Sequence, residues 1–399
     1  MAQSRQEKTT VVVVGAGAAG LTVANMLQRS GIDCVVLERR DRAYIEQRQR
    51  AGSIEPRAVK MFERWGLADQ VVSGPAYNGV IEIRVDGESR LLKESLEGTM
   101  GPTSRICPQK VLVQNLIATF LEGGGDLRFE VDDVTFDNLT GAQPTVGYRD
   151  KEGVAHEIAC YVVAGCDGDR GVSRAAIPEG VLTAYAQDYG ISWLTVYADV
   201  PLAGHLLMGI SPDGFAAQFP RGLLASRFYL QCTPGDQAED WPDERVWEQL
   251  RIRLGDKDLP TGPILEKETF PLRSVVYEPM SHGKLFLVGD VAHIMSPVSG
   301  KGMNLALHDA EVFATAVRDL VKDGDQEGLR SYSDTCLRHV WNYQEFSGWM
   351  TEMLHDATAT DDDSGTGSFR SKIARARLER VTTSPAAARA YGELMSGLS

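Results

Sequence analysis

The sequence predicts a mixed α/β fold that contains a Rossmann-like dinucleotide-binding unit. Three blocks of the 399-residue chain support this fold class, at residues 11–20, 161–174 and 284–304. In each block a short apolar, strand-like run leads directly into a turn that contains glycine. Buried strands of parallel sheets have such continuous apolar runs, and nucleotides bind near the ends of these strands.

The first block forms a complete strand–helix–strand unit. Val11 to Val14 predict a buried strand, and a glycine-rich turn at 15–20 follows without a linker. Residues 21–30 are expected to form a helix, and residues 35–37 a second strand that ends at Glu38. Glu38 lies 18 residues beyond Gly20, where an acidic residue is expected to bind a ribose hydroxyl.

Each glycine of this turn has a separate physical task. Gly15 permits the tight turn, Gly17 lets a pyrophosphate approach the backbone, and Gly20 lets the helix pack close to the strand. Free N–H groups at the helix N-terminus, beside Ala19, favour the negative phosphates. A glycine-rich turn that binds no ligand is the alternative, but the strand, helix and acidic residue together favour a dinucleotide site.

The other two blocks repeat the change from strand to turn. Residues 161–168 end in a turn that contains Asp167, and residues 284–293 end in a turn that contains Asp290. Pro297 and a second glycine-rich stretch follow, and then a helix that is expected to run to about residue 322. Taken alone, this last block could be a loop before a core helix.

The composition excludes several classes of function. The chain has 41 Lys+Arg and 55 Asp+Glu residues, a formal net charge of −14, which argues against nucleic acid and anionic membranes as partners. No apolar run is long enough for a transmembrane helix, and the polar N-terminus does not resemble a signal peptide. The six cysteines are scattered and no metal-binding motif is present, so we expect buried thiols, no metal and a cytoplasmic location.

The three blocks, in this order, resemble the aromatic hydroxylases that use a single FAD. Over nearly its whole length the chain is most similar to the 4-hydroxybenzoate 3-hydroxylase family. The local matches are residues 48–52, 164–168, 239–241, 271–274, 283–293 and 349–351. The resemblance implies an α/β fold with a Rossmann-like, GR2-type FAD-binding domain, an inserted β-sheet substrate domain and C-terminal helices. It also implies non-covalent FAD, a nicotinamide donor and O2, with oxygen delivered to an aromatic carbon through a flavin C4a-hydroperoxide.

The resemblance also assigns roles to residues of the cofactor site. For FAD they are Gly15, Gly17, Ala19, Gly20, Glu38, Arg50, Gln109, Asp167, Asp290, Gly302, Met303 and Asn304. The helix N-terminus at 302–304 is expected to face the pyrimidine edge of the flavin, where its dipole stabilises the reduced anion. Pro297 is expected to offer its carbonyl near the reacting carbon, although it could simply stop a helix.

Four further positions match those that handle the nicotinamide nucleotide: Arg39, Tyr44, Arg48 and Arg273. Arg39 and Arg40 together form a plausible clamp for a 2′-phosphate, so we expect NADPH rather than NADH. The alternative is that these two arginines are a solvated surface pair.

The substrate segment departs from the family pattern. Arg221 and Tyr229 keep the partners of a substrate carboxylate, although Arg221 could be a mere surface residue. A serine of the family is replaced by Phe219, and the tyrosine that contacts the substrate phenol is replaced by Met208. Two other members of the proton relay align with Met395 and Tyr77, and Arg227 completes the candidate catalytic residues.

These replacements predict a different substrate. Without the relay that deprotonates a phenol, the substrate must already be rich in electrons, or another base must act. We therefore expect a bulkier, indole-like, carboxylate-bearing secondary metabolite that is acidic and hydrophobic. The alternatives are a true 4-hydroxybenzoate-type phenol hydroxylase, or a monooxygenase whose oxygenation leads to epoxidation, rearrangement or cyclisation of the substrate. Baeyer–Villiger insertion and a non-catalytic FAD protein also remain open, whereas the WxWxIP segment of flavin halogenases is absent.

The expected FAD-binding domain is discontinuous and takes residues 1–75, 102–180 and 268–350. The substrate sheet takes 76–101 and 181–267, and residues 351–399 form a C-terminal helical region. Residues 358–367, rich in Asp, Thr, Ser and Gly, are expected to form a mobile loop. Family precedent makes a homodimer plausible.

Overall fold

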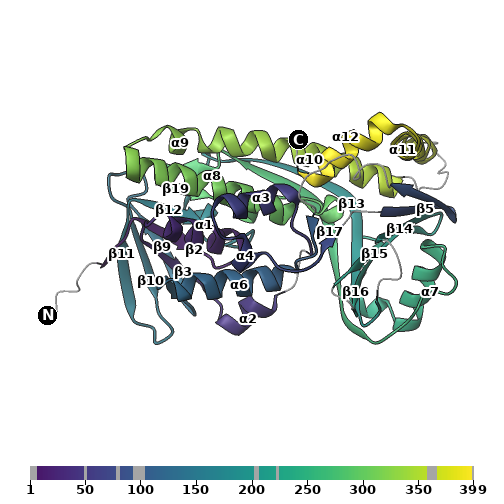
Figure 1. Ribbon diagram of the computed structural model, residues 1–399, viewed down its shortest axis with the longest axis horizontal. Helices are drawn as coiled ribbons and strands as arrows, with labels where there is room; N and C mark the ends of the chain where they lie inside the picture. Colours follow the sequence, from purple (N-terminus) through teal and green to yellow (C-terminus); the bar gives the residue numbers. More distant parts are fainter. Residues whose placement is uncertain are drawn as a thin grey trace.

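The computed structural model describes residues 7–48, 52–77, 81–92, 104–201, 206–221, 224–356 and 366–397. The chain builds two large sheets that lie at opposite ends of its long axis, with helices packed along them (Figure 1). Among the described residues, no helix combines the length and apolar content needed to cross a lipid bilayer. Within the same ranges, no group of three or more His, Cys, Asp or Glu side chains could hold a metal ion.

The first sheet has six strands and includes the strands before the three glycine-containing turns. Its order is β18-β19-β12-β2-β3-β8, and all neighbours are parallel except β18 and β19. The strands are β2 (Val11–Val14), β3 (Cys34–Leu37), β8 (Asp126–Arg128), β12 (Val162–Gly165), β18 (Ser281–His282) and β19 (Leu285–Leu287). The four central strands are buried along their whole length, which is why their sequences are apolar without alternation.

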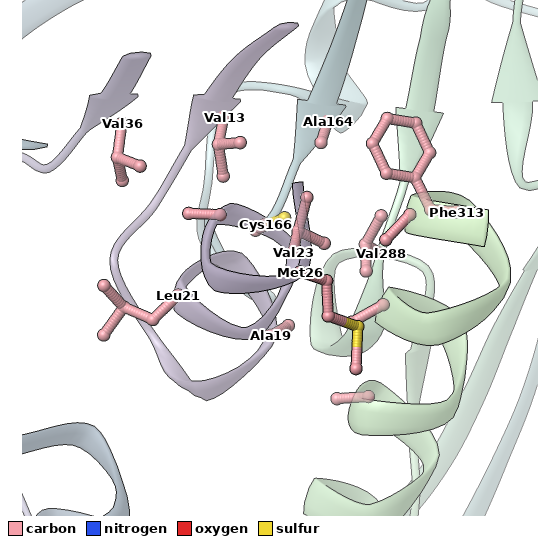
Figure 2. Packing of buried hydrophobic residues seen from close by; sticks show 14 of the residues in the cluster. Val13, Ala19, Leu21, Val23, Met26, Val36, Ala164, Cys166, Val288 and Phe313 are labelled. Atoms are coloured by element: carbon pink, nitrogen blue, oxygen red, sulfur yellow. The ribbon is translucent and has the colours of Figure 1, made fainter. Parts of the chain in front are cut away.

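Helices cover this sheet and close its core. They are α1 (Ala18–Arg29), α2 (Arg42–Gln47), α3 (Pro56–Arg64), α4 (Ala68–Val71), α6 (Gln109–Glu122), α8 (Gly302–Asp323) and α9 (Glu327–Arg330). Figure 2 shows Val23 and Met26 of α1 in one cluster with Val13 of β2, Ala164 of β12 and Phe313 of α8. This packing joins the three blocks, which are far apart in the sequence, into one core.

Helix α1 begins three residues earlier than the apolar pattern indicated. Gly17 takes an extended N-cap conformation, with φ −76° and ψ −176°, so Ala18, Ala19 and Gly20 already belong to the first turn. Small residues in this turn allow the helix to start directly against the strand. The long helix expected up to about residue 322 is α8, which ends at Asp323 before Gly324.

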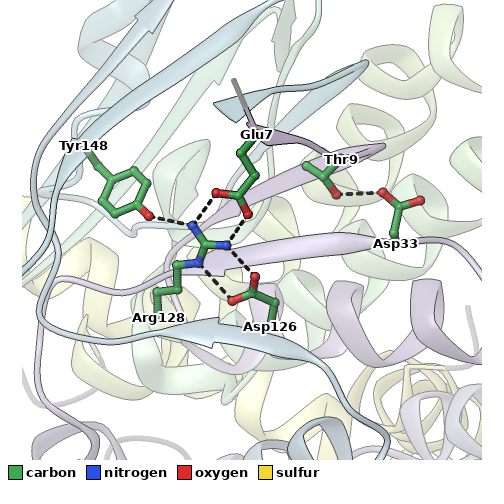
Figure 3. A network of polar contacts seen from close by, with 6 residues as sticks. All are labelled: Glu7, Thr9, Asp33, Asp126, Arg128 and Tyr148. Carbon is green, nitrogen blue, oxygen red and sulfur yellow. Dashed lines mark hydrogen bonds and ion pairs between the residues drawn. The ribbon is translucent and has the colours of Figure 1, made fainter. Parts of the chain in front are cut away.

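A second, smaller sheet of four strands lies beside the six-stranded sheet. Its order is β1-β11-β10-β9, with β1 (Glu7–Lys8), β9 (Asp132–Asp137), β10 (Thr145–Arg149) and β11 (Ala155–Ala159). Figure 3 shows how Arg128 at the end of β8 ties the two sheets together. Its guanidinium donates to Glu7 of β1 and to Asp126, and it also donates to the hydroxyl of Tyr148 on β10 at 2.6 Å. These partners raise the pKa of Arg128, so the cation is permanent.

The second large sheet has eight strands in the order β20-β17-β13-β16-β15-β14-β5-β6. The strands are β5 (Ile81–Val85), β6 (Glu88–Leu92), β13 (Thr183–Ala198), β14 (Leu206–Ser211), β15 (Gly214–Pro220), β16 (Ser226–Cys232), β17 (Ile264–Glu278) and β20 (His293–Ile294). A small separate pair is made by β4 (Ala76–Tyr77) and β7 (Ser104–Arg105). One face of the eight-stranded sheet packs against α7 (Asp243–Arg253), and the other belongs to a cluster with the C-terminal helices.

The C-terminal region contains α10 (Tyr332–His355), α11 (Thr366–Thr383) and α12 (Pro385–Ser396). The helical tail is thus interrupted, because Pro385 starts a new helix that Ser384 caps by accepting from the Ala387 N–H at 3.4 Å. Most of the loop expected at 358–367 lies outside the described residues, whereas Thr366 and Gly367 already belong to α11.

We propose to keep the division into FAD-binding and substrate parts. The six-stranded sheet takes its strands from the first three expected ranges, and the eight-stranded sheet takes most of its strands from 76–101 and 181–267. The boundary at 268 falls inside the continuous strand β17, which pairs along its length with β13. The two parts are therefore joined by a long antiparallel pair of strands and not by a linker.

Candidate active site

The glycine turn between β2 and α1 has the geometry of a phosphate cradle. Gly15 has φ +107°, and a Cβ there would lie 2.5 Å from the carbonyl oxygen of Cys166. A Cβ at Gly20 would lie 2.0 Å from the carbonyl oxygen of Gly15, whereas a Cβ at Gly17 would meet nothing within 4 Å. Gly15 and Gly20 are thus required by the fold itself, and Gly17 faces open space where a ligand can approach.

Glu38 is held beside this turn. Its Oε2 accepts from the Ala16 N–H and its Oε1 from the Arg40 N–H, both at 2.8 Å. The side chain is buried, and two backbone donors fix its orientation. Each carboxylate oxygen can accept a second hydrogen bond, so a ribose hydroxyl remains an acceptable partner.

Asp167 stabilises the second turn by hydrogen bonds to Ser173. Its Oδ2 accepts from the Ser173 N–H at 2.8 Å and from the Ser173 hydroxyl at 3.0 Å, while its Oδ1 is buried without a partner. Burial raises the pKa of Asp167, against the lowering effect of the Ser173 donors. The carboxyl group therefore braces the turn and keeps one acceptor oxygen available.

The third turn is braced by a residue that the sequence motifs did not single out. Asp309 of α8 is fully buried, and its Oδ2 accepts from the Gly289 N–H at 3.0 Å and lies 2.7 Å from His293 Nε2. Burial alone would lower the pKa of His293, but the carboxylate of Asp309 holds it above its ordinary value. Asp290 itself is half-buried and follows Gly289 in the turn. The sequence did contain a signal for Asp309, because a carboxylate on the buried face of a helix needs a polar partner.

The N-terminus of α8 contains an unpartnered donor. Asn304 is buried, its Oδ1 accepts from the Glu55 N–H at 3.1 Å, and its Nδ2 has no hydrogen-bond partner. A Cβ at Gly302 would meet nothing within 4 Å, so space is open at the start of the helix. Met303 beside them is also buried. Free N–H groups, an orphaned amide and open space suit the carbonyl-rich pyrimidine edge of a flavin.

Next to these residues lies a buried ion pair that was also missed. Lys301 Nζ lies 2.7 Å from Glu55 Oε1 and donates to the Met395 carbonyl at 2.7 Å. Burial raises the pKa of Glu55 and lowers that of Lys301, and each charge opposes the shift of the other. The pair fixes α3, α8 and α12 to one another around the start of α8.

The three turns and the α8 N-terminus fit FAD. The open Cβ positions at Gly17 and Gly302, the oriented carboxylate of Glu38 and the free Asn304 amide are where the phosphates, ribose and ring of this cofactor would be received. Gln109 begins α6, and Arg50 lies outside the described residues.

The residues expected at the nicotinamide nucleotide lie at the surface. Arg39 and Arg40 are exposed, and among the described residues neither forms an ion pair with a carboxylate. The Arg40 guanidinium lies 5.0 Å from the ring centroid of Tyr44. Arg48 follows α2 as its C-cap residue, and Arg273 pairs with Asp169 of the second turn at 2.6 Å. These residues come from separate elements: Arg39 follows β3, Tyr44 lies in α2 and Arg273 lies on β17.

The substrate candidates share one face of the eight-stranded sheet. Met208, Ala217, Tyr229 and Thr195 form a row across β14, β15, β16 and β13, each directly opposite the next. Phe219 lies beside Tyr229 with its ring edge-on at 5.5 Å. Met208 is buried, and Met395 of α12 packs against the same apolar cluster. The side chain of Tyr77 lies outside the described residues.

Arg221 lies at the edge of this face. Its guanidinium donates to the Tyr229 hydroxyl at 3.0 Å and to the Pro220 carbonyl at 2.9 Å. A Cβ at Gly52 would lie 2.2 Å from Arg221 Nη1, so the guanidinium packs against the chain that precedes α3. Arg227 is buried in the next cross-strand row, donates to Thr195 Oγ1 at 3.3 Å, and leaves its Nε unpartnered.

The Pro297 turn faces this sheet. Pro297 begins the short helix η4 (Pro297–Ser299) and is exposed, while Met295 and Val298 on either side share the apolar cluster of Met208. Ser296 before it is completely buried. The turn thus lies between the α8 N-terminus and the substrate face, where a flavin ring and an aromatic substrate can meet.

Comparison with known proteins identifies the chain. The FAD binding domain family matches residues 8–347. The chain is 35% identical over 395 residues to p-hydroxybenzoate hydroxylase of Acinetobacter baylyi, which covers 98% of this chain and 96% of that enzyme. The chain belongs to the FAD-dependent aromatic hydroxylases. It is a flavin-dependent monooxygenase, as the resemblance in the sequence implied.

Two further aromatic hydroxylases show a lower sequence identity to this chain. Aklavinone 12-hydroxylase of Streptomyces peucetius is 26% identical over 338 residues, which cover 75% of this chain and 65% of that enzyme. Among solved structures, p-nitrophenol 4-monooxygenase of Pseudomonas putida has a TM-score of 0.82 at 18% identity and covers 98% of this chain and 99% of that one. This structural likeness confirms the expected hydroxylase fold.

Proposed function

We propose that this aromatic hydroxylase uses NADPH and O2 to oxygenate a bulky, electron-rich, carboxylate-bearing aromatic compound, such as an indole-containing secondary metabolite. 4-Hydroxybenzoate is not the expected substrate. FAD, when bound, supplies the chemistry that activates O2 after reduction by the nicotinamide. The chain's own residues bind and orient the substrate and exclude water around it.

The observation that carries this proposal is the Arg221–Tyr229 pair at the edge of an apolar face. A guanidinium that donates to a tyrosine hydroxyl can bind a carboxylate in a bidentate fork. From Tyr229 the row continues through Ala217 to Met208, and neither of these two side chains offers a hydroxyl to a phenol. A methionine here adapts to a larger apolar ring and cannot assist deprotonation.

The remaining candidates have supporting tasks in this proposal. Phe219 narrows the carboxylate end of the pocket with an apolar ring, and the buried Arg227 adds a cation that favours an acidic substrate. The Pro297 carbonyl accepts from the Gly300 N–H at 3.0 Å, and its assigned task is to orient the carbon to be oxygenated. The six free, buried cysteines agree with the cytoplasmic location that we propose, and family precedent supports a homodimer.

The decisive experiment measures the rate of flavin reduction by NADPH against a panel of indole carboxylates, other aromatic acids and their amides. We expect an indole-type acid to accelerate reduction most, with little H2O2 released per NADPH oxidised. Efficient, tightly coupled turnover of 4-hydroxybenzoate would overturn the substrate proposal and leave the hydroxylase assignment in place.

Two substitutions in the pocket are expected to change the substrate preference. Met208→Tyr together with Phe219→Ser adds two hydroxyls and removes a large ring, which should favour small phenolic acids over indole acids by at least about tenfold in kcat/KM. The measurement is steady-state kinetics with both substrate classes. An unchanged ratio would mean that these residues do not line the pocket.

The preference for NADPH is expected to depend on Arg39. Arg39→Ala removes a cation near the expected 2′-phosphate, so KM for NADPH should rise by about 10-fold while KM for NADH stays within about twofold. Kinetics with both donors measure this. A wild-type enzyme with lower KM and higher turnover for NADH would contradict the proposal.

A further inference from the structure

A buried polar stripe on α10 touches both halves of the candidate active site. The stripe consists of Ser347, Thr351 and His355, which are spaced four residues apart and therefore lie on one face of the helix. All three are at most 2% exposed. Helix α10 contacts α8, η4, β15 and β17, so it runs between the cofactor side and the substrate sheet (Figure 1).

At one end, the stripe holds the residue that precedes Pro297. Ser347 Oγ donates to the Ser296 carbonyl at 2.9 Å. Thr351 Oγ1 donates to the Ser347 carbonyl at 2.7 Å, so it must accept from the Ser296 hydroxyl, 2.9 Å away. The carbonyl and the hydroxyl of Ser296 are thus both hydrogen-bonded to α10, which holds the start of the Pro297 turn in place.

At the other end, the stripe holds an aromatic residue of the substrate sheet. The Trp193 indole N–H donates to His355 Nε2 at 2.8 Å. Because indole can only donate, Nε2 is the acceptor, and His355 Nδ1 carries the hydrogen and donates to the Thr351 carbonyl at 2.8 Å. Burial lowers the pKa of His355 to about 4, so the ring is neutral near pH 7 and this tautomer is maintained.

Trp193 connects this histidine to the carboxylate candidates. Its ring is buried, stacks on Phe215 at 5.6 Å, and contacts the ring of Tyr229 at 4.8 Å. The Tyr229 hydroxyl in turn accepts from Arg221 at 3.0 Å. One continuous path therefore runs from Arg221 through Tyr229, Trp193, His355 and Thr351 to Ser296.

We propose that the α10 stripe is a positioning device that sets the carboxylate anchor, Arg221 and Tyr229, at a defined distance from the Pro297 turn. His355 acts through Trp193 on the anchor, and Thr351 acts through Ser296 on the turn. None of the three stripe residues contacts substrate. This inference rests on the proposed function, because it takes Arg221 as the carboxylate partner.

The first test measures binding to the FAD-loaded protein by the change in flavin absorbance. The probes are indole-2-carboxylate and 4-hydroxybenzoate, each compared with its carboxamide. His355→Leu should weaken carboxylate binding at least tenfold and leave carboxamide binding within threefold. His355→Gln, whose amide can both accept from Trp193 and donate to Thr351, should restore the carboxylate preference to within threefold of wild type.

A second measurement reports on the hydrogen bond without any ligand. With 15N-labelled tryptophan, assigned by Trp193→Phe, the Trp193 indole N–H signal should shift and exchange faster in His355→Leu, and return in His355→Gln. Thr351→Val should leave carboxylate affinity within threefold but increase the H2O2 released per NADPH severalfold. Thr335→Val, an exposed site on the same helix, is the matched control and should change neither quantity.

The outcomes separate the two proposals. If the wild-type protein binds FAD but binds neither carboxylate more tightly than its carboxamide, Arg221 is not a carboxylate partner. The proposed positioning role of the α10 stripe is then wrong as well. A carboxylate preference that survives His355→Leu, or a loss that His355→Gln does not repair, overturns the positioning role alone.

Discussion

Gly17→Ala is expected to weaken FAD binding at least about tenfold without unfolding the protein. The added methyl group meets no protein atom within 4 Å, and the residue has extended φ and ψ angles that alanine adopts freely. A pyrophosphate that approaches this backbone would be pushed away from its N–H donors. Loss of one charge-assisted hydrogen bond costs about 1.5–3 kcal/mol, or about 10- to 150-fold in affinity.

The matched substitution is Gly20→Ala, only three residues away. Its methyl group would lie 2.0 Å from the Gly15 carbonyl oxygen, so the overpacked core should lose about 1–3 kcal/mol or more of stability even without cofactor. For Gly17→Ala, the stability of the apoprotein should fall by less than about 1 kcal/mol, the usual effect of alanine at an N-cap. Thermal melting of apoprotein and FAD titration measure the two effects. Equal FAD affinity in wild type and Gly17→Ala would show that the FAD phosphates do not bind at this turn.

Arg221→Gln is expected to abolish most of the discrimination for an acidic substrate. The glutamine removes the charge and one arm of the fork, so an aromatic carboxylate should bind about 10- to 150-fold more weakly. The corresponding carboxamide should bind almost as before. Arg221→Lys keeps the charge but not the planar fork, so it should recover only part of the loss.

The control for this prediction is Arg245→Gln. Arg245 is exposed on α7, which covers the opposite face of the sheet, and its guanidinium lies over Trp241. It should leave both affinities unchanged. The carboxylate role of Arg221 fails if Arg221→Gln weakens the carboxylate and the carboxamide equally, because that result indicates a distorted pocket.

Much of the cofactor side could be predicted from the sequence because its signals are local. The turn at Gly15, Gly17 and Gly20 lies within six residues, and its strand and helix are adjacent in the chain. The physical demands on each glycine come from backbone geometry, which neighbouring residues determine. The start of α1 at Ala18 was missed, because alanine and glycine carry no helical apolar pattern.

The supporting residues could not be predicted in this way. Asp309 accepts from the Gly289 N–H, twenty residues earlier, and Lys301 pairs with Glu55, 246 residues earlier. His355 reaches Trp193 across more than 160 residues. Each of these polar residues has its partner far away in the sequence, so the partner is known only after the helices and sheets have packed.

The sequence by itself therefore determined the fold class, the hydroxylase family and the order of the cofactor turns, because these depend on contiguous patterns. Only the tertiary structure decided which side chains share a site. It placed Arg221 against Gly52 and Tyr229, and Met208 in one row with Ala217 and Tyr229. The reason is strand register: neighbours across a sheet are set by pairing and packing over the whole domain, and no local pattern encodes them.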